Sequence, residues 1–438
     1  MATSTQPNFL FFLPDQHRFD WVPWNPTLPV KMPTLAEIAS RGVRFTRAIT
    51  PSPLCSPARA CLALGLPYER CSVPDNAHNI PLDQPTYYRA LRDAGYRVAG
   101  VGKFDLGKGL HDWAITGQRL LPEWGFTEGI DNEGKLDAIS SYQNVEPKKT
   151  PKGPYMAYLR ERGLDEVHVK DFRARRNRGT FPTPLPEDAY CDNWIARNGA
   201  HFLRSFPTDQ PWHLVVNFNG PHSPFDVTES MRRAWQDVPF PPPVENEDDL
   251  APEEHRAIRQ NYAAMLENID RRMADLLQIV RERGELDRTV IVYSSDHGEM
   301  LGDHARWGKT VHYQPSVGIP FVVSGYGVSP RVAGTASDAL VSLHDVTATF
   351  VELAGAKAWP GMESRSVTPV LRGETSSHRD VARSALLDWR MVWDGRHKLV
   401  RRGDDTLLYD LQEDPTEAHD LTDQRPQEVA RLEPLLSA

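Results

Sequence analysis

Two predicted strands each end in polar residues that can bind a metal ion. The apolar runs at residues 8–13 and 289–294 are typical of buried strands, and each is followed within two residues by a carboxylate. A single aspartate in such a place usually caps a turn. If the two strands are neighbours, however, their ends meet at the edge where open α/β sheets bind ligands, and the donors suit Ca²⁺, Mg²⁺ or Mn²⁺. The candidate ligands are Asp15, Gln16, Asp296 and His297.

One of the four cysteines stands in an unusual pattern. Cys55 opens the segment C-x-P-x-R, which ends at Arg59. In a chain of this composition, fewer than about 0.04 matches to that pattern are expected by chance. The other cysteines, Cys61, Cys71 and Cys191, are irregularly spaced, so we expect reduced thiols there. Cys55 is therefore the candidate functional cysteine, with a small buried apolar residue as the alternative.

With these motifs in view, the chain resembles the formylglycine-dependent sulfatases of the alkaline phosphatase-like superfamily. The resemblance covers most of the chain, because the matching segments occur in the family's order. They are Asp15-Gln16, 55–65 (CSPARACLALG), 70–76, 102–107 (GKFDLG), 221–224 (PHSP), 295–299 (SDHGE), 302–304 (GDH), 308–309 (GK) and 408–411 (LYDL). The resemblance implies hydrolysis of an organic sulfate ester to an alcohol and inorganic sulfate. It also implies that a formylglycine-generating enzyme oxidises Cys55 to formylglycine, and that residue 55 joins the four metal ligands around one divalent ion, with Ca²⁺ preferred over Mn²⁺ or Mg²⁺.

An aldehyde suits this reaction better than a thiol, because a thiol adduct must later be released. Once the aldehyde is hydrated, one hydroxyl attacks sulfur and the other, after deprotonation, expels sulfate. A cation lowers the pKa of the hydroxyl and neutralises the sulfuryl oxygens. The resemblance implies that Arg59 holds the hydrate, that Lys103 and Lys309 bind sulfate oxygens, and that His222 protonates the leaving alcohol or contacts sulfate. It also places Asn76 near the nucleophile.

Asp105 departs from the family pattern, since many relatives have a histidine two residues after the active-site lysine. A carboxylate there is a candidate base for the hydrate, or a contact for a cationic or hydroxylated substrate. His304 and His312 are further candidates for the base. Trp307 is a candidate for the pocket wall, although a tryptophan is more often simply packed.

Alternating strand and helix patterns predict a large, mostly parallel mixed sheet sandwiched by helices, the alkaline phosphatase-like α/β class. Helices are expected at 32–41, 87–94, 188–206, 255–283 and 343–354, and further strands at 43–49, 97–101 and 213–218. Residues 106–186 show little periodicity, which predicts a loop-rich insertion that shapes the pocket. Its basic run at 170–178 favours a solvated loop over an anion-binding or subunit-contact segment.

The tail changes character after a proline-glycine turn at 360–361. Short strands at 385–388, 391–394, 397–401 and 406–410 predict a small antiparallel sheet. We therefore expect a catalytic domain at 1–372 and a small α+β subdomain at 373–438.

Composition limits the partners. Net charge is −9, which argues against nucleic-acid binding and against adhesion to an anionic membrane. No apolar stretch reaches the 18 residues typical of a membrane span, and the first residues lack the basic region of a signal peptide. We expect a cytoplasmic enzyme that acts on a small-molecule or saccharide sulfate ester. The sequence does not decide between a monomer and a homo-oligomer.

Three alternatives remain at this point. The first is a phosphonate monoester or phosphodiester hydrolase of the same superfamily, which Lys103 disfavours because such relatives tend to lack it. The second is a choline sulfatase, in which Asp105 or an aromatic residue recognises the quaternary ammonium. The oligomer-forming tail of those relatives is not evident. The third is a non-catalytic protein that binds an oxyanion beside an unmodified Cys55.

Overall fold

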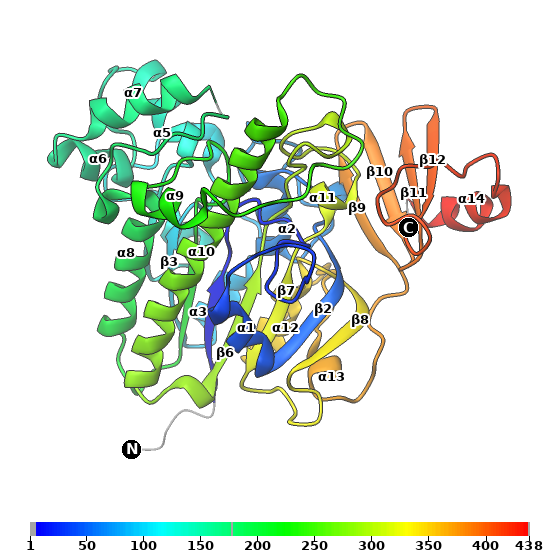
Figure 1. Ribbon diagram of the computed structural model, residues 1–438. Coiled ribbons are helices and arrows are strands. Elements are labelled where there is room, and N and C mark those ends of the chain that lie inside the picture. Colours follow the sequence, from blue (N-terminus) through cyan, green and yellow to red (C-terminus); the bar gives the residue numbers. More distant parts are fainter. Residues whose placement is uncertain (1–5, 177, 437–438) are drawn as a thin grey trace.

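The computed structural model describes residues 6–176 and 178–436, and its centre is an eight-stranded sheet (Figure 1). Every neighbouring pair is parallel except the two pairs that involve β7, so the predicted mixed, mostly parallel sheet is confirmed. The strand order is β4 (Glu128–Asp131), β3 (Arg97–Gly102), β5 (Trp212–Asn217), β1 (Asn8–Phe12), β6 (Thr289–Ser294), β7 (Phe321–Gly325), β2 (Gly42–Ile49) and β8 (Thr335–Ser342).

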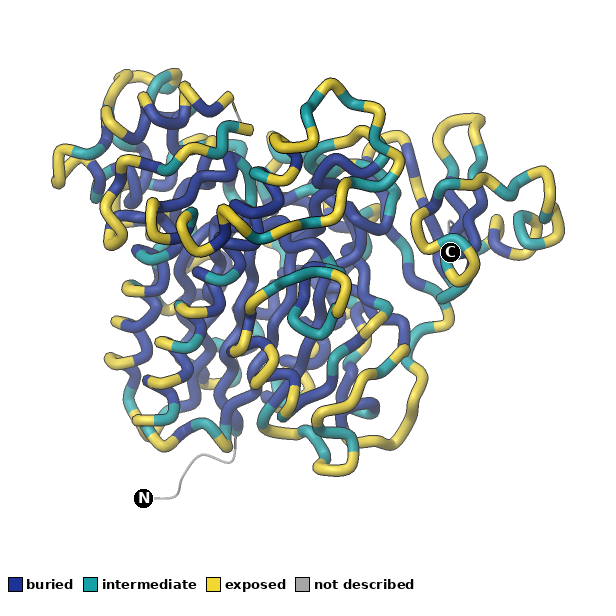
Figure 2. Tube along the Cα trace, viewed as in Figure 1, coloured by how far each residue is buried: buried dark blue, intermediate teal, exposed yellow. Residues whose placement is uncertain are grey.

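Helices cover both faces of this sheet because its central strands are apolar on both sides. In β1, Phe9 and Phe11 join one core cluster, while Leu10 and Phe12 join the other. Alternate side chains of a strand point to opposite faces, so a continuous apolar run is the pattern of a doubly covered strand. One face is covered by α1 (Pro33–Ser40), α8 (Cys191–Ser205) and α10 (Pro252–Glu282), and the other by α2 (Cys55–Leu64), α3 (Tyr87–Asp93) and α12 (Asp345–Leu353). Figure 2 shows the buried residues concentrated in these layers.

Residues 106–186 are not the loop-rich insertion that the sequence predicts. They contain α4 (Leu121–Trp124), β4, α5 (Lys135–Asn144), α6 (Pro154–Glu161) and α7 (Asp165–Arg175). These helices are short and carry charged residues among the apolar ones, so their periodicity is weak. In α7, Val169 and Phe172 are buried, and Arg175 forms a buried ion pair with Asp171 at 2.9 Å. The basic run at 170–178 is therefore helical as far as Arg175 and not a loop, but it is solvated as expected, since Lys170, Arg173, Arg176 and Arg178 are exposed; Asn177 lies outside the described residues.

The tail forms the predicted small antiparallel sheet. Its strands are β9 (Ala382–Leu386), β10 (Trp389–Trp393), β11 (His397–Arg402) and β12 (Asp405–Asp410). Trp389 and Met391 pack on Ile49 and Val317 of the main sheet region, which anchors this sheet beside the large one. The division at residues 372 and 373 stays a prediction. The remaining helices are α9 (Glu229–Trp235), α11 (Gln314–Val317), α13 (Thr368–Leu371) and α14 (Pro426–Leu432). Among the residues described, no helix is both long and apolar enough to cross a membrane.

A buried carboxylate ties the start of the tail to the main domain. Asp345, the first residue of α12, is fully buried and accepts hydrogen bonds from the backbone N–H groups of Ser342 at 2.9 Å and Arg365 at 2.8 Å. It also accepts from Arg379 Nε at 2.8 Å. Although burial raises the pKa of Asp345, the Arg379 guanidinium outweighs burial and holds that pKa far below its usual range.

We expect Asp345→Asn to lower the free energy of unfolding by about 3–5 kcal/mol, because it leaves the Arg379 charge buried without its partner. Urea denaturation measures this loss. Asp338→Asn is the matched control, since Asp338 is exposed on β8 and lies 3.9 Å from Arg47. It is expected to change stability by less than about 0.5 kcal/mol. A loss below about 1 kcal/mol for Asp345→Asn would contradict this role.

Candidate active site

The two predicted ligand pairs meet at one edge of the sheet. Strands β1 and β6 are parallel neighbours, with Phe12 opposite Tyr293, so both deliver the following residues to the same side. The backbone N–H of Gln16 donates to Asp296 Oδ1 at 2.9 Å, and that of His17 donates to Ser295 Oγ at 2.8 Å. These cross-links hold the two strand ends together. The expectation that the strands are neighbours is confirmed.

Cys55 begins α2 and points into this edge. Its Sγ lies 3.3 Å from His297 Nε2, 3.4 Å from Lys103 Nζ and 4.0 Å from Asp15 Oδ1. The thiol is buried, as are all these neighbours. One ligand atom from each of Asp15, Cys55, Asp296 and His297 lies within 4.8 Å of the others. The structure thus brings together four of the five predicted metal-site residues in one cluster.

This donor set fits a divalent cation. It offers two carboxylates and an imidazole whose Nδ1 is held 3.0 Å from the carbonyl oxygen of Gly298, which leaves Nε2 directed at the cluster. Gln16 adjoins this cluster through its backbone N–H, which donates to Asp296, while its Oε1 accepts from Lys309 Nζ at 2.6 Å and its Nε2 donates to Glu299. Burial and the Cys55 sulfur raise the pKa of Asp15, but Lys103 and other nearby cations outweigh them and hold that pKa below its usual range.

Arg59 and Lys103 supply positive charge next to the carboxylates of the cluster. Arg59 lies one helical turn after Cys55 on α2, so both face the same side. Its Nε donates to Asp296 Oδ2 at 3.0 Å, and its NH1 donates to Asn217 Oδ1 at 3.2 Å. Lys103 follows β3 and forms an ion pair with Asp15. The preceding Gly102 has φ 109°, and a Cβ there would meet the carbonyl oxygen of Asn217 at 1.8 Å, so only glycine permits this close approach.

The electrostatics of the cluster favour an anion at position 55. Burial alone raises the pKa of the Cys55 thiol, but Lys103, Lys309 and His297 outweigh burial and hold that pKa well below its usual value. The same positive field is available to any negatively charged group bound beside this residue.

His222 and Lys309 form the opposite side of the site. Lys309 Nζ lies 2.7 Å from His222 Nε2, while His222 Nδ1 contacts the carbonyl oxygen of Ser223. Burial and the Lys309 charge lower the pKa of His222. Asn76 Oδ1 accepts from the backbone N–H of Ser56 at 3.0 Å. It therefore caps the first turn of α2, whose N-cap residue provides no side-chain acceptor.

Asp105 is buried beside Lys103, and the alternative bases lie elsewhere. Its Oδ2 is 3.2 Å from Lys103 Nζ and 3.3 Å from Lys108 Nζ, and its Oδ1 has no hydrogen-bond partner among the described residues. Burial raises the pKa of Asp105 despite the two lysines. His304 stacks on Tyr313, and the His312 ring packs against the same tyrosine.

These two histidines and Trp307 are absent from the described lining of the pocket that contains Cys55. Trp307 stacks instead on His255 and lies beneath Arg178, which agrees with the alternative that this tryptophan is simply packed.

The pocket above Cys55 has a volume of about 420 Å³. Sequence reasoning missed Lys108, His111, Lys135 and Asp137 in its lining, because they belong to the segment interpreted as loops. For Lys108 the sequence did offer one signal of a place near the site, because this lysine follows Asp105 by three residues. The described lining residues are Cys55, Asn76, Ala77, Lys103, Lys108, His111, Lys135, Leu136, Asp137, His222 and Lys309.

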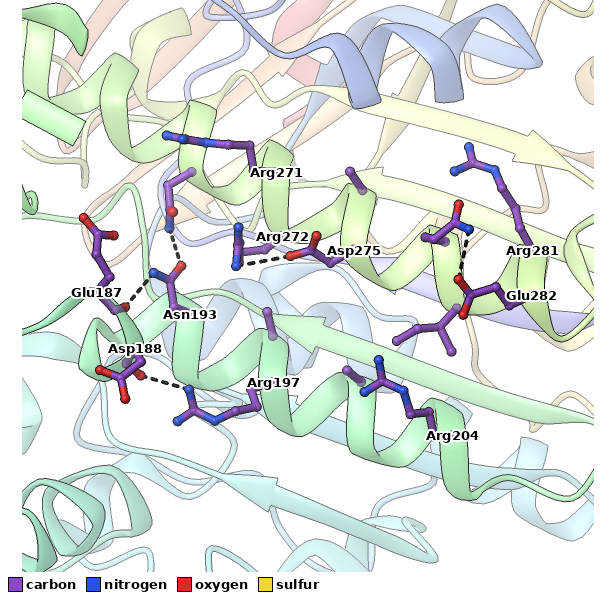
Figure 3. Close-up of a pocket in the computed structure, with 16 residues that line it drawn as sticks. Glu187, Asp188, Asn193, Arg197, Arg204, Arg271, Arg272, Asp275, Arg281 and Glu282 are labelled. Carbon is purple, nitrogen blue, oxygen red and sulfur yellow. Dashed lines mark hydrogen bonds and ion pairs between the residues drawn. The ribbon is translucent and has the colours of Figure 1, made fainter. Parts of the chain in front are cut away.

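A larger hollow lies between α8 and α10, with a volume of about 920 Å³ (Figure 3). Arginines from both helices project around it, among them Arg197, Arg204 and Arg271. None of its described lining residues is a cysteine, serine or histidine. Size alone therefore does not identify the reactive site, and the smaller pocket above Cys55 is the candidate.

The mixed sheet, with a buried cysteine, two aspartates and a histidine at its carboxyl edge, has the architecture of the alkaline phosphatase-like hydrolases. The family model "Sulfatase" matches residues 7–356, and the model "N-sulphoglucosamine sulphohydrolase, C-terminal" matches residues 302–434. The chain belongs to the sulfatase family of sulfuric ester hydrolases, which confirms the resemblance carried by its motifs.

Individual relatives agree with this assignment. A choline-sulfatase of Rhizobium meliloti is 26% identical, covering 96% of this chain and 83% of its own. An arylsulfatase of Clostridium perfringens is 24% identical, covering 95% and 90%. Among solved structures, the phosphonate monoester hydrolase of Agrobacterium radiobacter superposes with a TM-score of 0.83 at 23% identity, covering 99% of this chain and 95% of that one. At that identity the structural likeness shows the fold.

Proposed function

We propose that the protein hydrolyses an organic sulfate ester to an alcohol and inorganic sulfate, with a formylglycine made from Cys55 as the nucleophile. The observation that supports this most is the place of Cys55: it starts the C-x-P-x-R segment and is buried among Asp15, Lys103 and His297. The aldehyde, when hydrated, supplies the attacking hydroxyl and a second hydroxyl whose deprotonation releases sulfate. A formylglycine-generating enzyme is the partner that this maturation requires.

We propose that Asp15, Gln16, Asp296 and His297, together with residue 55, hold one divalent metal ion. The metal ion, when bound, supplies positive charge that lowers the pKa of the hydroxyl and neutralises sulfuryl oxygens. Ca²⁺ remains the preferred ion and Mn²⁺ or Mg²⁺ the alternatives. Arg59 fixes Asp296 through its Nε and so positions a ligand.

The remaining side chains are assigned by their contacts. Lys103 and Lys309 flank the cluster, so we propose that both ammonium groups bind sulfate oxygens as charge develops. Because Lys309 Nζ lies 2.7 Å from His222 Nε2, we propose that His222 protonates the leaving alcohol or contacts sulfate. Asp105, with its free Oδ1, is the proposed acceptor of the hydroxyl proton. Asn76 lines the pocket and is proposed to contact sulfate.

Phosphonate monoester hydrolysis is the second candidate function. Two phosphonate monoester hydrolases, from Agrobacterium radiobacter and Silicibacter pomeroyi, superpose with TM-scores of 0.83 and 0.82. Lys103, whose ammonium group lies 3.4 Å from Cys55 Sγ, favours sulfate, because the family resemblance implies that phosphonate monoester and phosphodiester hydrolases tend to lack a lysine at this position.

Substrate comparison on one preparation separates these functions. We expect kcat/KM for an aryl sulfate to exceed that for a phosphonate monoester with the same leaving group by at least about tenfold, which corresponds to about 1.4 kcal/mol of transition-state binding. Release of the phenol measures both reactions. A phosphonate ester that is cleaved as well as, or better than, the sulfate would contradict the proposed function.

A further inference from the structure

The pocket has an outer wall that none of the proposed chemical steps uses. We define the outer wall as the lining residues beyond the metal cluster and the sulfate contacts: Ala77, Lys108, His111, Lys135, Leu136 and Asp137. It contains two lysines and a histidine against one carboxylate. Among the described residues that line the whole pocket, none is a phenylalanine, tyrosine or tryptophan. The wall therefore combines charged side chains with the apolar Ala77 and Leu136, and its described residues offer no aromatic face.

Lys108 is the central cation of this wall. Its ammonium group lies 3.3 Å from Asp105 Oδ2 and 2.8 Å from Asp137 Oδ2. Asp105 Oδ2 is also 3.2 Å from Lys103 Nζ, so one carboxylate oxygen separates Lys108 from a lysine of the sulfate site. An ammonium group has three donors, and these two carboxylates take two of them. The third donor of Lys108 has no acceptor within the described part of the chain.

The segment that carries Lys108 is held in place before any substrate binds. The backbone N–H of Gly109 donates to Asn79 Oδ1 at 2.9 Å, and a Cβ at residue 109 would lie 2.2 Å from the carbonyl oxygen of Ala77. Only glycine allows this close contact between the two segments. Lys135, by contrast, is tied inward by Asp226 at 2.6 Å. Lys108 therefore presents a preorganised charge, which favours binding because little side-chain freedom is lost.

We propose that the outer wall binds a second anionic group on the alcohol part of the substrate, with Lys108 as its main contact and the exposed His111 at the rim. The substrate class is then a sulfate ester whose alcohol carries a carboxylate or a further sulfate a few bonds from the ester. This inference rests on the proposed function. Asp137 is positioned to accept from a neighbouring hydroxyl. The described lining offers no aromatic side chain to pack on a quaternary ammonium group, so the wall disfavours choline sulfate.

The test compares kcat/KM for aryl sulfates that differ in one substituent. The panel is a neutral phenyl sulfate, its carboxylate-bearing analogue, an analogue with a second sulfate, and choline sulfate. We expect at least one dianionic ester to be favoured over the neutral ester by about tenfold or more, as one close charge pair in a partly buried site permits, and choline sulfate to be the poorest substrate. The carboxylate and sulfate arms show which anion the wall prefers.

The readout is a ratio, kcat/KM for the favoured dianionic ester divided by kcat/KM for the neutral ester. We expect Lys108→Gln to lower this ratio to near one and Lys108→Arg to retain it. Lys149→Gln, which removes an exposed lysine outside the pocket, should leave the ratio unchanged. Equal turnover of neutral and dianionic esters by the parent enzyme, which needs no variant, would overturn the inference. If phosphonate esters are cleaved and sulfate esters are not, the proposed function fails, and the same substituent series on phosphonates still tests the wall.

Discussion

Cys55→Ala is expected to fold as the parent chain does and to lose at least about 10⁴-fold in kcat, as replacement of a nucleophile does in other covalent enzymes. The fold should survive because alanine is a good helix former and the Sγ atom contacts polar groups. Steady-state hydrolysis of an aryl sulfate, together with circular dichroism, measures both effects.

Cys61→Ala provides the matched control, since Cys61 is a buried cysteine on the same helix but lies within the apolar core. Its loss should reduce stability modestly and leave kcat close to the parent value. If Cys55→Ala kept activity within tenfold of the parent, residue 55 could not be the nucleophile.

Asp296→Asn is expected to lower kcat/KM by more than about 100-fold, which exceeds the usual cost of losing an indirect partner of a metal ligand. The carboxylate accepts from the backbone N–H groups of Gln16 and His297 through Oδ1, and from Arg59 through Oδ2. An asparagine can still accept hydrogen bonds through its side-chain oxygen, but it removes the negative charge that this residue offers to a cation. Metal content by elemental analysis should fall below one ion per chain.

The control for metal content is Asp303→Asn. Asp303 is also a buried carboxylate, but Arg18 at 2.6 Å and Arg259 at 3.1 Å neutralise it outside the cluster. That variant should lose stability while keeping one ion per chain. Chelation of the parent enzyme should abolish turnover, and Ca²⁺, Mn²⁺ or Mg²⁺ should restore it. Full metal content and activity in Asp296→Asn would contradict the proposed ligand set.

The sheet and the cluster of Asp15, Asp296 and His297 were predictable because the same residues carry both signals. The runs that become β1 and β6 are mostly apolar, as is typical of buried parallel strands, and a carboxylate follows each strand within three residues. The expected helices at 255–283 and 343–354 correspond to α10 and α12, whose apolar faces pack on the sheet. The roles of individual site residues stay predictions until they are tested.

The sequence predicted that residues 106–186 shape the pocket, but the individual residues of the outer wall were not predictable for a physical reason. Lys108 and Asp137 are 29 positions apart in sequence and meet only because the segment between them folds into short helices with weak periodicity. What distinguishes these two residues is that they form an ion pair in the lining of one pocket, and no local sequence pattern predicts such a pair. Asp105 illustrates the same limit, since its departure from the family pattern was visible but its contact with two lysines was not.

The most direct test of the nucleophile is the mass of the tryptic peptide 48–59 from active enzyme. Conversion of the cysteine side chain to an aldehyde lowers that mass by about 18 Da. We predict that specific activity across preparations rises in proportion to the converted fraction and extrapolates to zero without it. Full activity in a preparation whose peptide carries only the unmodified thiol would contradict the account.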